Sequence, residues 1–322
     1  MYGLELTPEH PVAQLSAFAE TAEEVGFDAV FASHHYNNRD QFTVLTDIAR
    51  RTDSIRLGPG IANPYETHPV TLASRMATLE ELSGGRGIFG VGPGDRSTLA
   101  NLGYEQDAPL RRTLETMKVA QKLWRGERVD HEGTFRATDA ELNYEVGEVP
   151  VYVGAQGPHM TRMAAKHATG VLYNGSRPKD IRWAAEQVET GLAERPEERG
   201  SFDFAAYASV SVAEDETAAR EAARPPVAFI AGSAAPPLLE RHSLDQDRAE
   251  RIGAAIECGD FEEAFGSVSE AMIDALCIAG TPEDVAETVE RVLDTADSFV
   301  AASPLGPDVE RAIELLGSAV PS

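Results

Sequence analysis

The chain alternates short apolar segments with amphipathic helical segments along most of its length. Eight segments rich in β-branched or aromatic residues predict strands, and between them apolar residues recur at helical spacing. This alternation requires parallel strands joined by helical crossovers. Eight such units favour an α/β fold closed into a (β/α)8 TIM barrel, and an open doubly wound sheet is the alternative. The predicted strands are 2–6, 27–33, 55–62, 87–92, 150–155, 170–174, 203–212 and 298–302.

Two stretches break the alternation and are predicted to be insertions. Residues 127–148 are acidic and have the pattern of a hairpin, and residues 224–280 are largely helical in pattern. We find no segment rich in Pro, Gly and Ser that would mark a linker. A barrel with insertions reaches the length of this chain, 322 residues, as one unit. The sequence therefore predicts a single TIM-barrel domain over residues 1–322.

Acidic residues strongly outnumber basic ones. Asp and Glu number 53 against 28 Lys and Arg, which gives a formal net charge of −25. This charge argues against nucleic acid or an anionic membrane as a partner, because both would be repelled. Either a positively charged partner or adaptation to high salt could explain it. The acids are spread through every predicted helix, which favours a halophilic protein, since salt screens self-repulsion.

Several features bear on localisation and on metals. No apolar run approaches the ~20 residues of a membrane span, and the first ten residues carry acid where a signal peptide would carry Lys or Arg. We therefore expect a cytoplasmic protein. The two cysteines, Cys258 and Cys277, match no metal or redox spacing, so we expect two reduced thiols and no metal site.

In a TIM barrel the active site lies at the C-terminal ends of the strands. Four of the predicted strand ends are rich in Gly, which lets backbone approach a ligand closely. Free N–H groups from Gly154 to Gly157, just before a predicted helix, would bind an anion. Alternatively, Gly and Pro only form turns there. No G-x-G-x-x-G or Walker A motif is present, which disfavours a Rossmann or P-loop site.

Four polar residues near these ends are candidates for chemistry. Strand alternation turns Glu5 away from the face of Leu4 and Leu6, so Glu5 could act as a general acid at the barrel mouth, or be a structural carboxylate bonded to an Arg or to backbone. His34 and His35 are adjacent, so only one of them would enter the site, and their spacing suits no metal. Asp95 could cap a helix or contact a ligand.

With these residues in view, the chain resembles the luciferase-like superfamily of flavin and deazaflavin barrels, and within it the F420-dependent methylene-tetrahydromethanopterin reductases. The combination of blocks is specific, and the blocks span the chain in the family's order. They are GLEL at 3–6, HYNNR at 35–39, LGPGIANPY at 57–65, ATLEELSGGR at 77–86, GVGPGDRST at 90–98, VPVYVGAQGP at 149–158, VAFIAGS at 227–233, ERH at 240–242, GTPEDV at 280–285 and SPLGP at 303–307.

The resemblance implies a coenzyme and a role for each matching position. Glu5 matches the family's proposed proton donor, Gly60–Ile61 its non-prolyl cis peptide behind the deazaflavin ring, and Asp95 an acidic residue near the pterin. Coenzyme F420 would then be the hydride carrier, and Glu5 and Asp95 the catalytic residues. The expected coenzyme-binding residues are Ser33, His34, His35, Gly60, Ile61, Asn63, Gly154, Ala155, Gln156, Gly157 and Asn174.

The resemblance further implies the reaction and the assembly. A 5,10-methylene-tetrahydropterin, either tetrahydromethanopterin or tetrahydrofolate, would be reduced to its 5-methyl form. Another F420-dependent dehydrogenase of the superfamily, or a non-catalytic coenzyme-binding protein, is the alternative function. Relatives form homodimers or homotetramers, and we expect the same here. One departure stands out, since relatives usually have Asp where this chain has His34.

Overall fold

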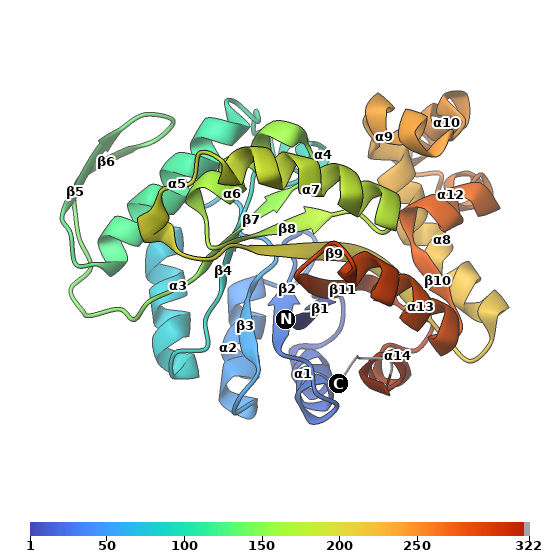
Figure 1. The fold of residues 1–322 in the computed structure, drawn as a ribbon, viewed down its shortest axis with the longest axis horizontal. Helices are drawn as coiled ribbons and strands as arrows, with labels where there is room; N and C mark the ends of the chain where they lie inside the picture. Colours follow the sequence, from blue (N-terminus) through green and yellow to red (C-terminus); the bar gives the residue numbers. More distant parts are fainter. Residues whose placement is uncertain (319–322) are drawn as a thin grey trace.

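The computed structural model describes residues 1–318 of the chain. Its centre is a parallel sheet in the order β3–β2–β1–β11–β9–β8–β7–β4, surrounded by helices (Figure 1). The strands of this path are β1 (Tyr2–Leu6), β2 (Ala29–Ala32), β3 (Arg56–Pro59), β4 (Phe89–Val91), β7 (Val151–Ala155), β8 (Gly170–Asn174), β9 (Asp203–Val212) and β11 (Ser298–Leu305).

The sheet closes between its first and last strands, β3 and β4. Two parallel bridges join them, Leu57 with Gly87 and Ala62 with Val91. The Ile88 N–H donates to the Leu57 carbonyl at 2.9 Å, and the Ala62 N–H donates to the Gly90 carbonyl at 2.8 Å. The predicted TIM barrel is thereby confirmed, and the open doubly wound sheet is excluded.

Helices form the outer layer because each buries an apolar stripe against the barrel. Their ends follow local chemistry: the Asp40 side chain caps α2, and Thr281 and Asp284 form a capping box on α13. The helices that cover the barrel are α1 (Val12–Glu24), α2 (Gln41–Arg51), α3 (Pro69–Ser83), α5 (Pro109–Trp124), α6 (Pro158–His167), α7 (Pro178–Leu192), α13 (Pro282–Leu293) and α14 (Val309–Ser318), with the short α4 (Arg96–Asn101) and η1 (Glu197–Arg199) in connecting segments.

Buried apolar residues form three clusters. The largest packs the outward side chains of the strands against the surrounding helices. A second, which includes Phe31, Tyr152, Leu172 and Val300, comes from the opposite faces of the strands and fills the barrel interior. The third lies within the helical segment that follows β9. The alternating strand pattern therefore separates an interior core from an exterior one.

The two predicted interruptions lie at opposite ends of the molecule (Figure 1). The first forms an antiparallel hairpin of β5 (Val129–Glu132) and β6 (Arg136–Ala140). The second is mainly helical, but its first helix already starts at Glu216, and its last residues form a strand, β10 (Ile278–Gly280), parallel to the end of β9. Its helices are α8 (Glu216–Ser233), α9 (Pro236–His242), α10 (Gln246–Glu257), α11 (Phe261–Gly266) and α12 (Glu270–Leu276).

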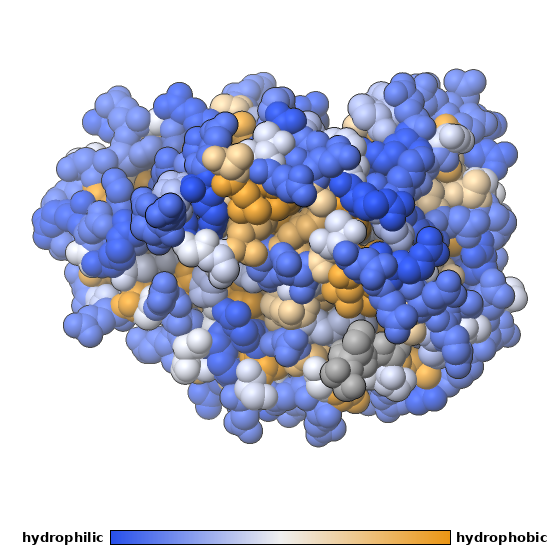
Figure 2. Space-filling model, viewed as in Figure 1, coloured by the Kyte–Doolittle hydropathy of each residue, from blue (hydrophilic) through white to orange (hydrophobic). Residues whose placement is uncertain are grey.

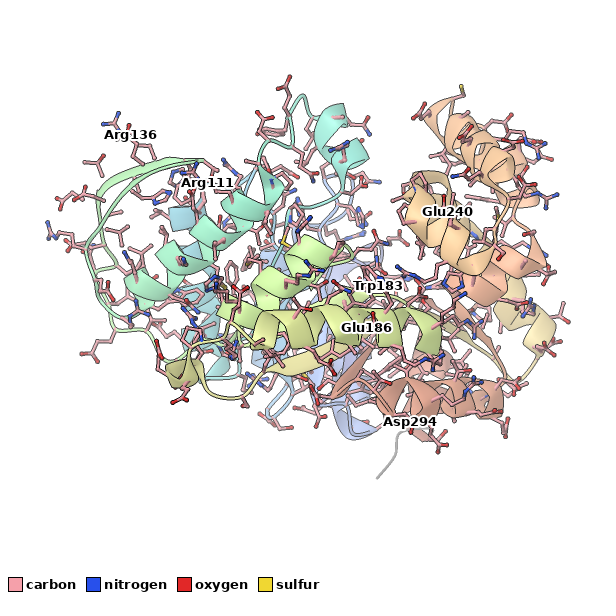
Figure 3. The ribbon with its side chains drawn as sticks, turned by 45° about the horizontal axis from the view of Figure 1, so that its top comes forward. Arg111, Arg136, Trp183, Glu186, Glu240 and Asp294 are labelled. Atoms are coloured by element: carbon pink, nitrogen blue, oxygen red, sulfur yellow. The ribbon has the colours of Figure 1, made fainter. Side chains whose placement is uncertain are left out.

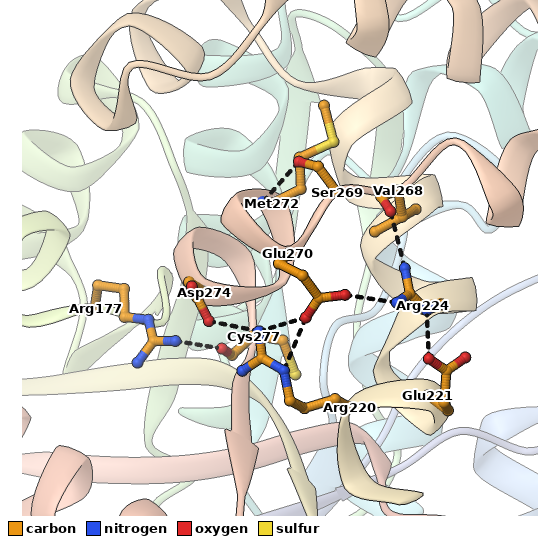
Figure 4. A network of polar contacts seen from close by, with 10 residues as sticks. All are labelled: Arg177, Arg220, Glu221, Arg224, Val268, Ser269, Glu270, Met272, Asp274 and Cys277. Atoms are coloured by element: carbon orange, nitrogen blue, oxygen red, sulfur yellow. Dashed lines mark hydrogen bonds and ion pairs between the residues drawn. The ribbon is translucent and has the colours of Figure 1, made fainter. Parts of the chain in front are cut away.

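Arginines connect the second segment internally and to the barrel (Figure 4). Arg220 and Arg224 on α8 both pair with the Glu270 carboxylate at the start of α12. Arg177, which precedes α7, donates to the Cys277 carbonyl at 2.9 Å. These contacts hold α12 and β10 beside the end of β8.

Figure 2 shows hydrophilic side chains over most of one face, with hydrophobic ones mainly in the hollows between them. Within residues 1–318, no helix combines the length and apolar character that a membrane span needs.

Candidate active site

Glu5 faces the interior of the barrel, and strand alternation correctly predicted that it lies on the face of β1 opposite Leu4 and Leu6, which pack in the outer cluster. Gly3, two residues earlier on β1, packs against Val300 and Phe31 of the interior cluster, so Glu5 shares that side of the strand. Glu5 is only 3% exposed. A carboxyl group therefore lies at the C-terminal end of β1, inside the barrel wall.

The orientation of Glu5 is fixed by hydrogen bonds to both carboxyl oxygens. The Thr7 hydroxyl donates to Oε1 at 3.0 Å, and the backbone N–H of Ser303 donates to Oε2 at 3.0 Å. Glu5 is thus hydrogen-bonded to backbone, which was one of the two arrangements expected from the sequence. These bonds do not preclude chemistry, since they also aim the carboxyl group in one direction.

Tyr207 on β9 lies at the same level of the barrel. Its hydroxyl donates to the Gly60 carbonyl at 3.3 Å. Burial, and secondarily the nearby charge of Glu5, raise the pKa of Tyr207 well above its usual value. Tyr207 therefore stays a neutral hydrogen-bond donor that braces the segment after β3.

Ile61 occupies a space left by three glycines. The Gly60–Ile61 peptide bond is cis, as the family resemblance implied. A Cβ on Gly92 would lie 2.4 Å from Ile61 Cδ1, and a Cβ on Gly154 would lie 2.9 Å from Ile61 Cγ2; Gly90 also borders this side chain. These glycines on β4, β7 and the loop after β4 are needed because Ile61 fills the room of their missing side chains.

Asn63 and His34 meet at Glu66. The His34 ring nitrogen Nε2 lies 3.0 Å from Glu66 Oε1, and the Asn63 amide donates to the same oxygen at 3.4 Å. Asn63 is buried, and its carbonyl oxygen accepts from the Tyr65 N–H at 2.8 Å. The strand-based prediction for the two histidines was wrong in one respect: β2 ends at Ala32, so both follow the strand and alternation does not orient them.

The other expected coenzyme residues lie on the ends of β2, β7 and β8. Gly157 is the N-cap of α6, and no side chain caps that end of the helix. Ala155 is buried, whereas Gln156, Gly157, His35 and Asn174 are exposed and Ser33 is half-buried. The N-terminal N–H groups of α6 therefore have no side-chain cap.

Asp95 caps the short helix α4. Its carboxylate accepts from the Thr98 N–H at 2.7 Å. The capping role expected for it is thus present. Asp95 is exposed after the C-terminal end of β4, and its contact with a ligand stays a prediction.

Comparison with known proteins settles the family. Residues 3–298 match the luciferase-like monooxygenase family. The chain belongs to this family.

Within the luciferase-like family, the chain is similar to reductases of one kind. It is 39% identical to the 5,10-methylenetetrahydromethanopterin reductase of Archaeoglobus fulgidus, over 99% of this chain and 98% of the relative, and 39% identical to that of Methanolobus tindarius, over 99% of both. The structure of the coenzyme F420 dependent tetrahydromethanopterin reductase from Methanopyrus kandleri matches with a TM-score of 0.91 at 38% identity, over 99% of this chain and 97% of that one.

Sequence reasoning missed three residues of this luciferase-like site. Thr7 and Ser303 hold Glu5, and Tyr207 braces Gly60. Alternation along β9 could have identified Tyr207, because Ala205 lies in the interior cluster and Tyr207 is two residues further on. No pattern in the sequence links Ser303 to Glu5, since 298 positions separate them.

A separate hollow of about 390 Å³ lies between loops of the luciferase-like barrel. Tyr65, Tyr104 and Arg112 line it, with Arg112 stacked 4.7 Å from the centre of the Tyr65 ring. Glu5 is not among its lining residues, so we do not place the reaction there. Among the described residues, no group of three or more His, Cys, Asp or Glu side chains is arranged to hold a metal ion.

Proposed function

We propose that this chain reduces a 5,10-methylene-tetrahydropterin to the 5-methyl form with a hydride from reduced coenzyme F420. Relatives 39% identical along nearly the whole chain carry the name of this reductase. The structural observation that carries the proposal is the buried, doubly hydrogen-bonded Glu5 inside the barrel mouth. This enzyme is accordingly an oxidoreductase.

The residues at the barrel mouth fit coenzyme F420. The backbone N–H groups of Gly154, Ala155, Gln156 and Gly157, at the end of β7 and just before α6, would bind its phosphate, which the N-terminus of α6 also favours. The cis Gly60–Ile61 segment, braced by Tyr207, would support the ring; Ser33, His34, His35, Asn63 and Asn174 would border the coenzyme. When bound in its reduced form, the coenzyme supplies a hydride.

The chain itself must supply a proton. A methylene group bridging two nitrogens accepts hydride poorly, and protonation of one nitrogen opens the ring to a methylene iminium cation. Glu5 holds the proton for that step, and its carboxylate then stabilises the adjacent cation. Thr7 and Ser303 keep the carboxyl group aimed, and Asp95 would add negative charge or bind the pterin amino groups.

Following the deazaflavin absorbance tests the reaction. Reduced coenzyme should be oxidised on addition of methylene-tetrahydromethanopterin or methylene-tetrahydrofolate, and the faster substrate identifies the carrier. Oxidised coenzyme reduced by an alcohol or a sugar phosphate instead would establish another dehydrogenase. If the coenzyme binds but none of these substrates is turned over, the chain is a non-catalytic coenzyme-binding protein.

We further propose a homo-oligomer, a homodimer or a homotetramer, that works in a salt-rich cytoplasm. Three aromatic rings cluster on the helical segment after β9: Phe229, Phe261 and Phe265, with ring centres 5.9–6.2 Å apart. Phe229 and Phe261 are nearly half exposed, which is unusual for side chains of this size on a surface so rich in acid. Light scattering at molar KCl, with Phe229→Ser as the variant, tests whether this cluster contacts a second copy.

A further inference from the structure

This inference rests on the proposed function and concerns how Glu5 is reprotonated after it has given its proton to the substrate. In that reaction Glu5 loses one proton to the substrate in each turnover, so it must gain another before the next. Glu5 is 3% exposed, and a bound substrate would cover it further. A route from solvent to the buried carboxylate is therefore needed.

A row of hydroxyl groups leads to Glu5. Thr7 Oγ1 lies 3.0 Å from Glu5 Oε1 and 2.7 Å from Ser303 Oγ. The Ser33 hydroxyl approaches Thr7 Oγ1 at 3.4 Å. Thr7, Ser33 and Ser303 are all half-buried, whereas Glu5 is buried, so the row runs from the rim inward.

Proton counting gives this row a direction. Once Glu5 has given up its proton, its carboxylate can only accept, so the single hydroxyl proton of Thr7 is donated to Glu5 and Ser303 becomes the donor in the bond to Thr7. Ser33 also donates to Thr7. Thr7 thus accepts from the outer hydroxyls and donates to the carboxylate, which is the order that inward proton transfer requires.

The backbone of β11 makes the arrangement possible. Its pairing with β9 shifts register between Ala302 and Leu305, which leaves Ser303 outside the ladder. The N–H of Ser303 is therefore available to Glu5 while its hydroxyl contacts Thr7. The other nearby hydroxyl, that of Tyr207, donates to the Gly60 carbonyl instead.

We propose that Thr7 and Ser303 form a proton relay that reprotonates Glu5 after each turnover. The Ser303 hydroxyl accepts a proton from a solvent hydronium ion or buffer acid and passes its own proton to Thr7 Oγ1. Thr7 in turn passes its own proton to the Glu5 carboxylate. At each hydroxyl one O–H bond forms and one breaks, and nothing is oxidised or reduced. Both are positioning residues, since the relay acts on substrate only through Glu5.

Comparison of the first turnover with steady state tests the relay. Thr7→Val removes the hydroxyl at nearly constant shape, Ser303→Ala keeps the N–H to Glu5, and Thr7→Ser keeps a hydroxyl. Thr46→Val is the matched control, because the Thr46 hydroxyl only donates to its own helix at Phe42. Circular dichroism and the thermal midpoint establish that each variant is folded.

In rapid mixing, Thr7→Val and Ser303→Ala should keep most of the first-turnover rate, because the Ser303 N–H still holds Glu5, and should then slow about 10- to 100-fold. The slow phase should carry an increased solvent deuterium isotope effect and should be rescued by a small weak acid such as formate buffer. Thr7→Ser should restore much of the steady-state rate that Thr7→Val loses, and Thr46→Val should behave like the parent.

Three results would overturn the relay: an unchanged steady-state rate in Thr7→Val, a first turnover slowed as much as steady state, or no rescue by small acids. The Glu5→Gln variant distinguishes a failure of the relay from a failure of the proposed function. If Glu5→Gln keeps a normal first turnover, the role of Glu5 fails; if only Thr7→Val behaves unexpectedly, the relay alone fails.

Discussion

Ile61 Cδ1 occupies the place that a side chain on Gly92 would need, with only 2.4 Å between that carbon and an added Cβ. The two residues come from different strand ends, after β3 and β4, and meet because the barrel closes between those strands. This contact makes the segment behind the expected coenzyme ring sensitive to the smallest enlargement of a glycine.

Gly92→Ala should therefore destabilise the protein by about 1–3 kcal/mol through overpacking. Ile61→Val removes Cδ1, so the double variant should recover much of that loss. Urea unfolding at constant salt measures the free energy of unfolding of the single and the double variant. Gly157→Ala is the control, because no atom lies within 4 Å of its added Cβ. Equal losses in the single and double variants would show that Ile61 is not the obstacle.

Glu5→Gln should keep coenzyme binding and lower kcat by ~100-fold or more, because the amide retains the shape but has no acidic proton. Coenzyme affinity is measured by fluorescence titration and turnover by the deazaflavin absorbance. A variant with near-normal kcat would remove Glu5 from the mechanism.

Glu115 on α5 should make stability depend on acid pH. Burial alone would raise the pKa of Glu115, but hydrogen bonds from Thr134, Arg111 and His131 outweigh burial and hold it at about 2, against an ordinary 4.5. Because the pKa is depressed in the folded state, this stabilisation is complete above pH 4.5 and is lost as pH falls towards 2.

The Glu115→Gln variant should accordingly lose on the order of 2 kcal/mol at neutral pH, since hydrogen bonds to a charged group contribute about that much. The difference from the parent should shrink as pH falls below 4.5. Urea unfolding across pH measures this difference, with Glu132→Gln as the control, because Glu132 is exposed on the neighbouring hairpin strand β5. A difference that does not change with pH would contradict the assignment.

Coenzyme affinity should rise with salt. The coenzyme's phosphate and glutamate tail are anionic and the protein carries a formal charge of −25, so they repel in dilute buffer. Raising KCl from about 0.1 M to about 1 M shortens the Debye length from ~10 Å to ~3 Å and screens that repulsion. Fluorescence titrations at both salt levels measure the dissociation constant. Affinity that declines steadily with added salt would oppose this expectation.

Local patterns predicted most of the architecture. Apolar segments rich in β-branched or aromatic residues placed all eight barrel strands, and strand alternation put Glu5 on the face opposite Leu4 and Leu6. The cis peptide at Gly60–Ile61 was implied by the family resemblance. Errors arose where tertiary pairing decides the outcome. β10 is a three-residue strand that exists by pairing with the end of β9, and β2 stops at Ala32, before His34.

The sequence by itself indicated the barrel through eight alternating strand and helix patterns, and the family through blocks that resemble its members. Strand alternation determined that Glu5 lies on the face of β1 opposite Leu4 and Leu6, because that pattern depends only on neighbouring residues. Only the tertiary structure decided which groups meet Glu5. Thr7 is two residues away, but Ser303 comes from the other end of the chain and reaches Glu5 through barrel closure and an irregular register in β11. Such contacts depend on how distant strands are aligned, and no local periodicity carries that information.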